Sequence, residues 1–243
     1  VANLALHDDA PFVGSAAFSH KGGMHTDALT KNTKSYELFD PSEVGNKRHI
    51  LMSEVAGGSS VMKLLGKIDP TVTKKDPRTR EIIDRMKEME FLGYQYEAAE
   101  ASFELIIRRI LGLYNPSFEL VEFKVMVNEP NVTNMNSTAM IKIKVRDEYE
   151  VTAAEGDGPV DALDGALRKA LTKFYPDLGK IKLTDYKVRV LDSEMATAAK
   201  VRVLIESTDG KNEWTTIGVS TDIIEASWIA LVDSIEYCMC QDG

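Results

Sequence analysis

The stretch that decides the fold is TAAEGDGPVDALDGALRKAL, residues 152–171. It joins a strand end, a glycine-rich turn and the first turns of a helix, and it occurs twice. When position 154 is placed on position 218, GVSTDIIEASWIALVDSI (218–235) lies over residues 154–171, and FKVMV (123–127) lies over KVRVL (187–191). Self-similarity of this length predicts two copies of one supersecondary unit.

The hydrophobic period predicts what each copy contains. From residue 117 onward apolar and polar residues alternate, as in half-buried strands, and each alternating region ends in a helical pattern. The first copy is predicted to have strands over 118–127, 139–145 and 149–153, followed by the glycine-rich turn and a helix that ends at 174. The second copy is predicted to have strands over 186–191, 199–205 and 214–219 and a helix over 222–238. The sequence therefore predicts an α+β fold with two pseudo-symmetric βββα units, repeats 117–175 and 182–240. Each sheet is covered by its helix on one face, and the free faces are expected to pack together or on a second chain.

The residues before the repeats are helical and loop-rich. A truncated helix is expected over residues 1–9, a glycine pair at 57–58 is expected to end one element, and helices are predicted over 78–92 and 96–112 as a helical hairpin. We therefore expect a linker region over 1–115 and a separate domain over 116–243.

Composition limits the classes of function. The chain has 243 residues, 44% hydrophobic and 28% charged, with a net charge of −9, which disfavours nucleic acid and anionic membranes as partners. Cys238 and Cys240 lie two apart on a predicted helix, so they do not face each other. A disulfide framework and a thiolate metal site are thus excluded, and with no signal-peptide pattern we expect a cytoplasmic location.

Few residues stand out as chemical groups from the sequence alone. His20 and His25 flank a glycine pair without a third ligand at metal-binding spacing, so loop filler and acid–base catalyst are equally good interpretations. A lone Tyr36 is more often a packing residue. Asp157 and Asp161 begin a helix, where carboxylates ordinarily cap and stabilise the dipole.

A set of motifs in fixed order carries a family resemblance: AFSHKGGMHTDAL (17–29), SYELFDPSEVGN (35–46), GYQYEAAEASFELI (93–106) and the two repeated stretches. Together they resemble the C-terminal portion of the 2-isopropylmalate/homocitrate/citramalate synthase family, closest to its (R)-citramalate synthase branch. The family has a catalytic (β/α)8 barrel that binds a divalent metal and acyl-CoA. No such barrel pattern occurs here, so the resemblance implies neither a metal site nor a cofactor in this chain.

The resemblance also implies catalytic roles. His25 matches the catalytic histidine of the family, Tyr36 its tyrosine and Asp27 an associated acid. The implied activity is that of an acyltransferase, in which acetyl-CoA condenses with pyruvate on the metal and linker residues move protons. The chain alone is expected to be inactive.

An effector site follows from the resemblance as well. A zwitterion needs an acceptor for its ammonium and donors for its carboxylate, and Asp161 with the amides of the 156–161 turn offers both. The positions that match the isoleucine pocket of the family are Val160, Asp161, Leu183, Tyr186, Val190 and Val201. Without the resemblance, ordinary core packing and helix capping are the better interpretations of these residues. A homodimer through residues 117–243 is expected.

Three alternatives stay open at this point. The first is a leucine-regulated 2-isopropylmalate synthase, because isoleucine and leucine differ only in where one methyl group branches. The second is a stand-alone amino-acid-sensing module without catalysis. The third is a dimerisation domain with no ligand.

Overall fold

A computed structural model describes residues 10–14, 16–21, 28–29, 31–51, 57–127, 137–191 and 193–241. The chain divides into two compact units, one of Val1–Phe91 with Gln95–Glu97 and the other of Leu92–Tyr94 with Ala98–Gly243. This division falls before the last helix of the expected linker region, so that helix belongs with the sheets. A boundary of independent domains at residue 115 stays a prediction. The helix expected over residues 1–9 lies outside the described residues.

The first unit pairs two short strands and two helices. Strands β1 (Ser19–Lys21) and β2 (His49–Leu51) are parallel, and 3₁₀ turns cover Thr33–Ser35 and Pro41–Val44. Helices α2 (Gly57–Ile68) and α3 (Pro77–Phe91) pack together through a buried apolar core of Val61, Leu64, Leu65, Ile82 and Met86. The glycine pair at 57–58 begins α2 and does not end an element, which corrects the prediction.

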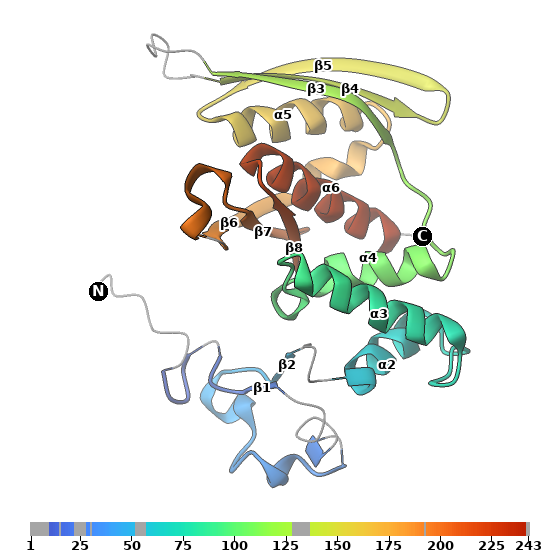
Figure 1. Ribbon diagram of the computed structural model, residues 1–243, viewed down its shortest axis with the longest axis vertical. Coiled ribbons are helices and arrows are strands. Elements are labelled where there is room, and N and C mark those ends of the chain that lie inside the picture. Colours follow the sequence, from blue (N-terminus) through green and yellow to red (C-terminus); the bar gives the residue numbers. More distant parts are fainter. Residues whose placement is uncertain are drawn as a thin grey trace. The chain divides into compact units, whose positions relative to one another are not determined.

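The second unit contains the two predicted βββα copies. Sheets of order β3-β4-β5 and β6-β7-β8 are both antiparallel, and α5 covers β4 and β5 as α6 covers β7 and β8 (Figure 1). The elements are β3 (Glu119–Val127), β4 (Ser137–Val145), β5 (Glu148–Gly156), α5 (Pro159–Thr172), β6 (Lys182–Val190), β7 (Val201–Thr208), β8 (Glu213–Ser220) and α6 (Ile223–Gln241). The α+β class and the pseudo-symmetric repeat are confirmed. Strand β6 starts at Lys182, earlier than expected, because a register shift between Leu183 and Asp185 interrupts its alternation.

Matching hydrogen bonds show how closely the copies agree. The hydroxyl of Thr152 donates to the carbonyl of Ala166 at 2.7 Å, and at the equivalent place in the second copy Thr216 donates to Ala230 at 2.8 Å.

The first strand of each copy follows a slightly different alignment. The register shift of β3 lies between Leu120 and Glu122, and that of β6 lies between Leu183 and Asp185. The first strands of the two copies therefore align one position closer along the chain than the sequence comparison assumed. The reason is that the β6–β7 connection is one residue longer than the β3–β4 connection. The correction matters because a one-residue slip exchanges the two faces of a strand.

Helices α5 and α6 contact each other within one apolar cluster that includes Leu163, Leu167, Trp228 and Ile235. The helices therefore pack on each other, and the expected packing of the two free sheet faces is not what joins the repeats. On the first sheet Met126, Tyr149 and Val151 stay exposed in the single chain.

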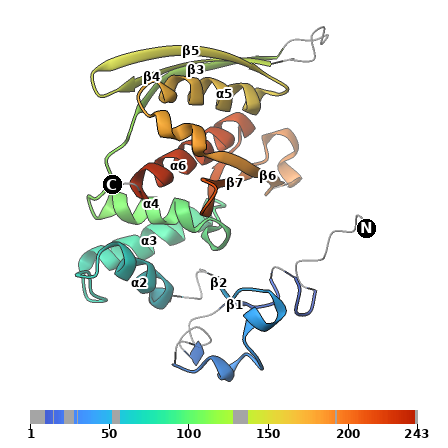
Figure 2. The same cartoon turned by 180° about the vertical axis from the view of Figure 1, so that it is seen from behind.

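Helix α4 (Glu100–Ile110) packs on α6 and on β8, as the rear view shows for α4 and α6 (Figure 2). Helix α3 packs on α2 in the first unit, whereas α4 belongs to the second unit, so the hairpin of the 78–92 and 96–112 helices stays a prediction. The hydroxyl of Ser102 on α4 accepts a hydrogen bond from the backbone N–H of Ile217 at 3.0 Å. Strand β8 pairs with β7 and forms the edge of its sheet, and this contact satisfies one of its backbone N–H groups.

The segment before α4 is fixed to the second sheet. The guanidinium of Arg202 on β7 donates through Nε to the carbonyl of Gly93 at 2.6 Å. Gly93 has φ +110°, and a Cβ there would lie 2.4 Å from Cδ1 of Leu191. Only glycine fits this close approach without displacing Leu191. Among the described residues, no helix is long and apolar enough to span a membrane.

Candidate functional site

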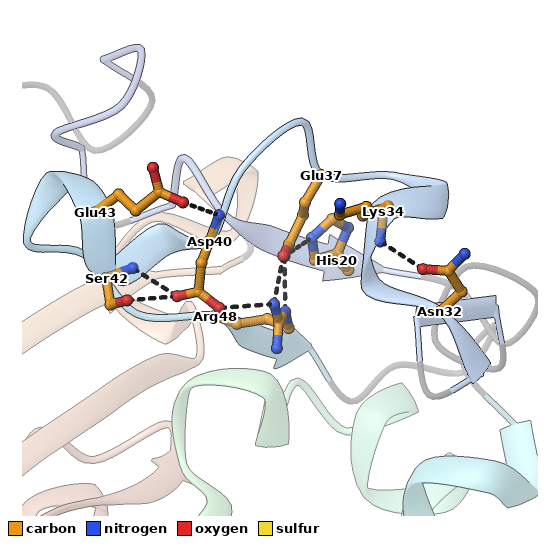
Figure 3. Close-up of polar contacts among 8 residues, drawn as sticks. All are labelled: His20, Asn32, Lys34, Glu37, Asp40, Ser42, Glu43 and Arg48. Atoms are coloured by element: carbon orange, nitrogen blue, oxygen red, sulfur yellow. Dashed lines mark hydrogen bonds and ion pairs between the residues drawn. The ribbon is translucent and has the colours of Figure 1, made fainter.

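The first candidate site is a polar cluster around Glu37, whose side chain is buried with 6% of the residue exposed. Arg48 donates through Nε to Oε1 at 2.8 Å and through Nη2 to Oε2 at 2.5 Å, and Nε2 of His20 lies 2.9 Å from Oε1 (Figure 3). Pairing of β1 with β2 brings His20 and Arg48 together, because His20 lies on β1 and Arg48 directly precedes β2. One buried carboxylate thus binds both a guanidinium and an imidazole.

Electrostatics fix the protonation pattern of this cluster. The hydrogen bonds from Arg48, with a smaller contribution from His20, hold the pKa of Glu37 below its ordinary value despite burial. Glu37 is therefore a carboxylate that can only accept, so the proton of the His20–Glu37 hydrogen bond lies on Nε2.

The loop that contains Glu37 alternates between exposed and buried side chains. Tyr36 is 49% exposed and Leu38 98% exposed, on either side of the buried Glu37. Asp40 then caps the next 3₁₀ turn, accepting from the N–H of Ser42 at 2.9 Å. The loop is therefore anchored on both sides of Tyr36 and Leu38, and it presents a phenol and an isobutyl group to solvent.

The predicted catalytic residues meet different outcomes. Tyr36 lies at this anchored loop, whereas His25 and Asp27 lie outside the described residues. Sequence reasoning missed Glu37 and Arg48, which are 11 residues apart in loops and share no periodic pattern. The signal available was weak: SYELF carries a single acid between apolar neighbours.

The second candidate site gathers four predicted effector residues. Val160, Leu183, Tyr186 and Val201 all pack on one apolar cluster of the second repeat, formed by Val203, Ile205, Ala226, Ala230 and Leu231. Residues from α5, β6 and β7 thus converge on α6, although they are far apart in sequence. The resemblance predicted this convergence, and spacing alone did not.

The other two predicted effector residues, Val190 and Asp161, are not part of this cluster. Val190 pairs with Val201 across β6 and β7 and is 52% exposed, so part of its side chain is uncovered in the single chain. Asp161 is exposed, and its Oδ2 accepts a hydrogen bond from the N–H of Asp157 at 3.0 Å. Asp161 therefore binds the backbone of the turn before α5, whereas the N-cap of that helix is Gly158, without a side-chain hydrogen bond, so neither Asp157 nor Asp161 caps it as the sequence predicted.

The hydroxyl of Tyr186 has a defined direction. It lies 2.7 Å from Oγ of Ser227, and that Oγ donates to the carbonyl of Ile223 at 2.6 Å. Because a serine hydroxyl has one proton, Tyr186 must donate to Ser227. The phenolic oxygen can consequently act only as an acceptor toward any further group.

Metal ligands do not cluster in the part of the chain that the structure describes. No group of three or more His, Cys, Asp or Glu side chains there is arranged to hold a metal ion. Cys238 and Cys240 are free thiols on α6.

Comparison with known proteins bears on both units. The family described as the LeuA allosteric (dimerisation) domain matches residues 97–239, and the homocitrate synthase post-HMGL domain-like family matches residues 12–92. The first of these covers more than half of the chain and coincides with the two βββα repeats.

Individual relatives agree with the families. The (R)-citramalate synthase of Aquifex aeolicus is 46% identical over 243 residues, which are 100% of this chain and 46% of the relative. The (R)-citramalate synthase of Geobacter sulfurreducens is 46% identical over 238 residues, which are 98% of this chain and 45% of the relative. That of Streptomyces coelicolor is 40% identical over 246 residues, which cover 100% of this chain and 46% of the relative. The chain spans slightly less than half of the length of these relatives. From the match to residues 97–239, the chain belongs to the family of the LeuA allosteric (dimerisation) domain.

Proposed function

We propose that this chain is the linker and regulatory part of an (R)-citramalate synthase, and that its second unit binds isoleucine and inhibits condensation of acetyl-CoA with pyruvate. The observation that supports this most is the 46% identity to an (R)-citramalate synthase over the whole chain. The divalent metal and the acyl-CoA would be held by the remaining part of the synthase. The chain itself would act as a homodimer in the cytoplasm.

The effector part of the proposal stands on the second site. An amino acid with a branched apolar side chain would place that side chain on Val160, Leu183, Tyr186 and Val201. Its ammonium needs acceptors, which Oδ1 of Asp161 and the hydroxyl of Tyr186 offer. Val190 remains half exposed in the single chain, which supports a site completed near the dimer interface.

The catalytic part stands on the first unit. His25, Tyr36 and Asp27 would exchange protons with the enolate, the alkoxide and the thioester water of the condensation. The anchored loop around Glu37 supports this role for Tyr36, because a proton donor must be held in place to act. Since the metal and the acyl-CoA would be bound elsewhere in the synthase, the chain alone would not release CoA.

Titration calorimetry with isoleucine, leucine and valine tests the effector. Preference for isoleucine supports the proposal, preference for leucine favours a leucine-regulated 2-isopropylmalate synthase, and no binding of any of the three leaves only a dimerisation module. Asp161→Ala should weaken binding if its carboxylate receives the ammonium. Sedimentation at micromolar concentration should give about twice the 26.9 kDa mass of the chain.

The catalytic roles need the complete synthase. There, His25→Ala or Tyr36→Phe should lower kcat by roughly 10²–10⁴-fold with a smaller change in KM for pyruvate. Near-normal kcat in both variants would contradict the assignment. Assay of this chain alone with pyruvate, acetyl-CoA and a divalent cation should give only background thiol release.

A further inference from the structure

The two repeats differ most where the helix of one meets the sheet of the other. Ile224, Trp228 and Val232 on α6 all pack in the cluster of the first sheet. Trp228 lies 6.4 Å from the ring of Phe118 and 5.5 Å from that of Phe123, measured between centroids. An apolar stripe of α6 with i, i+4, i+8 spacing therefore completes the core of the first repeat.

The corresponding stripe of α5 is polar. In the alignment of the two helices, Ile224, Trp228 and Val232 correspond to Val160, Asp164 and Arg168. Val160 packs on the cluster of the second repeat, and Nη1 of Arg168 donates to the carbonyl of Ile181 at 2.7 Å, just before β6 begins. Asp164 lies one helical turn from each of them, so a carboxylate occupies the place that an indole fills in the first repeat.

Asp164 is only partly satisfied. Its Oδ2 accepts from Nε of Arg168 at 2.7 Å, and its side chain is 20% exposed. Its Oδ1 is buried, and no residue that the structure describes donates a hydrogen bond to it. A buried carboxylate oxygen without a donor is costly, so it marks a place where a donor from outside the chain would be stabilised.

The residues around this position point to the kind of donor. When the register shifts of β3 and β6 are superposed, Tyr186 corresponds to Phe123, the ring that Trp228 contacts in the first repeat. Asp164 and Tyr186 thus hold the positions that correspond to the contacting pair Trp228 and Phe123. The hydroxyl of Tyr186 donates to Ser227, so it can only accept from a ligand. Two acceptors next to an apolar cluster suit a group that only donates.

We propose that Oδ1 of Asp164, in place of Asp161, receives the ammonium of the amino-acid effector together with the hydroxyl of Tyr186, and that Asp161 chiefly holds the turn before α5 through the N–H of Asp157. This inference rests on the proposed effector function and identifies the residue that distinguishes an amino acid from its 2-oxo acid. The oxo acid lacks the three N–H donors that the two acceptors would satisfy.

The test compares two ligands in four forms of this chain. L-Isoleucine and 3-methyl-2-oxopentanoate share a carbon skeleton, and only the first has an ammonium. Calorimetry would measure both on the wild-type chain and on Asp164→Asn, Asp161→Asn and the control Glu213→Gln, at an exposed position of β8. We expect Asp164→Asn to weaken isoleucine binding about 10- to 100-fold and the oxo acid little, the range for loss of a charge-assisted hydrogen bond. Glu213→Gln should stay within about twofold of the wild type.

The outcomes separate this inference from the function that it assumes. If Asp164→Asn binds isoleucine as the wild type does while Asp161→Asn loses it, the ammonium lies at Asp161 and this inference is overturned, but the effector function stands. If the wild-type chain binds none of isoleucine, leucine and valine, the effector function fails first. Should Asp164→Asn melt early, the ¹³C carboxyl resonance of Asp164 in the wild-type chain decides, because isoleucine must shift it and the oxo acid must not.

Discussion

The two βββα repeats share a backbone plan and differ in how each closes its core. In the first, Trp228 fills the space next to Phe118 and Phe123, whereas the second receives Val160, Asp164 and Arg168. The difference teaches that a duplicated unit can keep one copy for stability and leave the other with side chains suited to binding. Substitutions at equivalent positions should therefore have unequal effects.

The largest inequality is expected at the Trp228–Asp164 pair. Trp228 is 9% exposed, so Trp228→Ala should lower the free energy of unfolding by about 3–5 kcal/mol through lost contacts and a residual cavity. Asp164→Ala should cost less than about 1 kcal/mol, because it also removes a buried oxygen without a donor. Urea unfolding of both variants would measure the difference, and equal losses would contradict the comparison.

A second inequality lies where each helix approaches its sheet. A Cβ on Gly218 would lie 1.9 Å from the carbonyl oxygen of Ala226, so Gly218→Ala should cost about 2–3 kcal/mol. The first repeat has Ala154 at the equivalent position and accommodates it with Gly165 on α5, where an added Cβ would be 3.3 Å from that of Ala154. Ala154→Gly is the matched control and should cost only about 0.5–1 kcal/mol. Thermal unfolding of the two variants at one pH would give the ranking.

Thr152 and Thr216 provide the opposite test, because the two repeats have the same hydrogen bond at these equivalent positions. Thr152→Val and Thr216→Val each remove one buried hydrogen bond to a helix carbonyl, at nearly equal distances. Each should cost about 0.5–1.5 kcal/mol, and the two losses should match within error. A difference above about 1 kcal/mol in urea unfolding would mean that the environments are less alike than the geometry shows.

The smallest effect concerns pH and a group that only the second repeat buries. Burial raises the pKa of Glu236 above its ordinary value of 4.5, although the N–H and hydroxyl of Ser117 oppose the rise. The folded chain then binds more protons than the unfolded chain between 4.5 and the raised pKa, so stability falls as pH rises through that window. Burial raises the pKa of Asp233 too, which adds to the fall.

Melting temperatures between about pH 4 and 7 test this sign. Glu236→Gln keeps the size of the side chain and an oxygen that can accept from Ser117, and it should flatten the decline. Glu213→Gln, at an exposed position, is the control that should leave the decline unchanged. A melting temperature of Glu236→Gln that falls with pH as steeply as in the wild type would remove Glu236 as a cause.

Sequence reasoning predicted more of the fold than of the candidate sites. The internal repeat and the change of hydrophobic period predicted both sheets and their helices, because they depend on local pattern. The one-residue difference in connection length was not visible until register shifts located it. Glu37, Arg48 and the buried Oδ1 of Asp164 were missed because burial of a charge depends on which distant segments meet, and no periodicity records that.

Strand β7 carries two of the features described above on adjacent residues. Val201 packs on the apolar cluster of the second repeat, and the next residue, Arg202, donates to the carbonyl of Gly93. Gly93 follows the last residue of α3 by two positions in the chain. The strand that contributes to the apolar cluster of the second repeat is thus tied, one residue further on, to the backbone of the segment between α3 and α4.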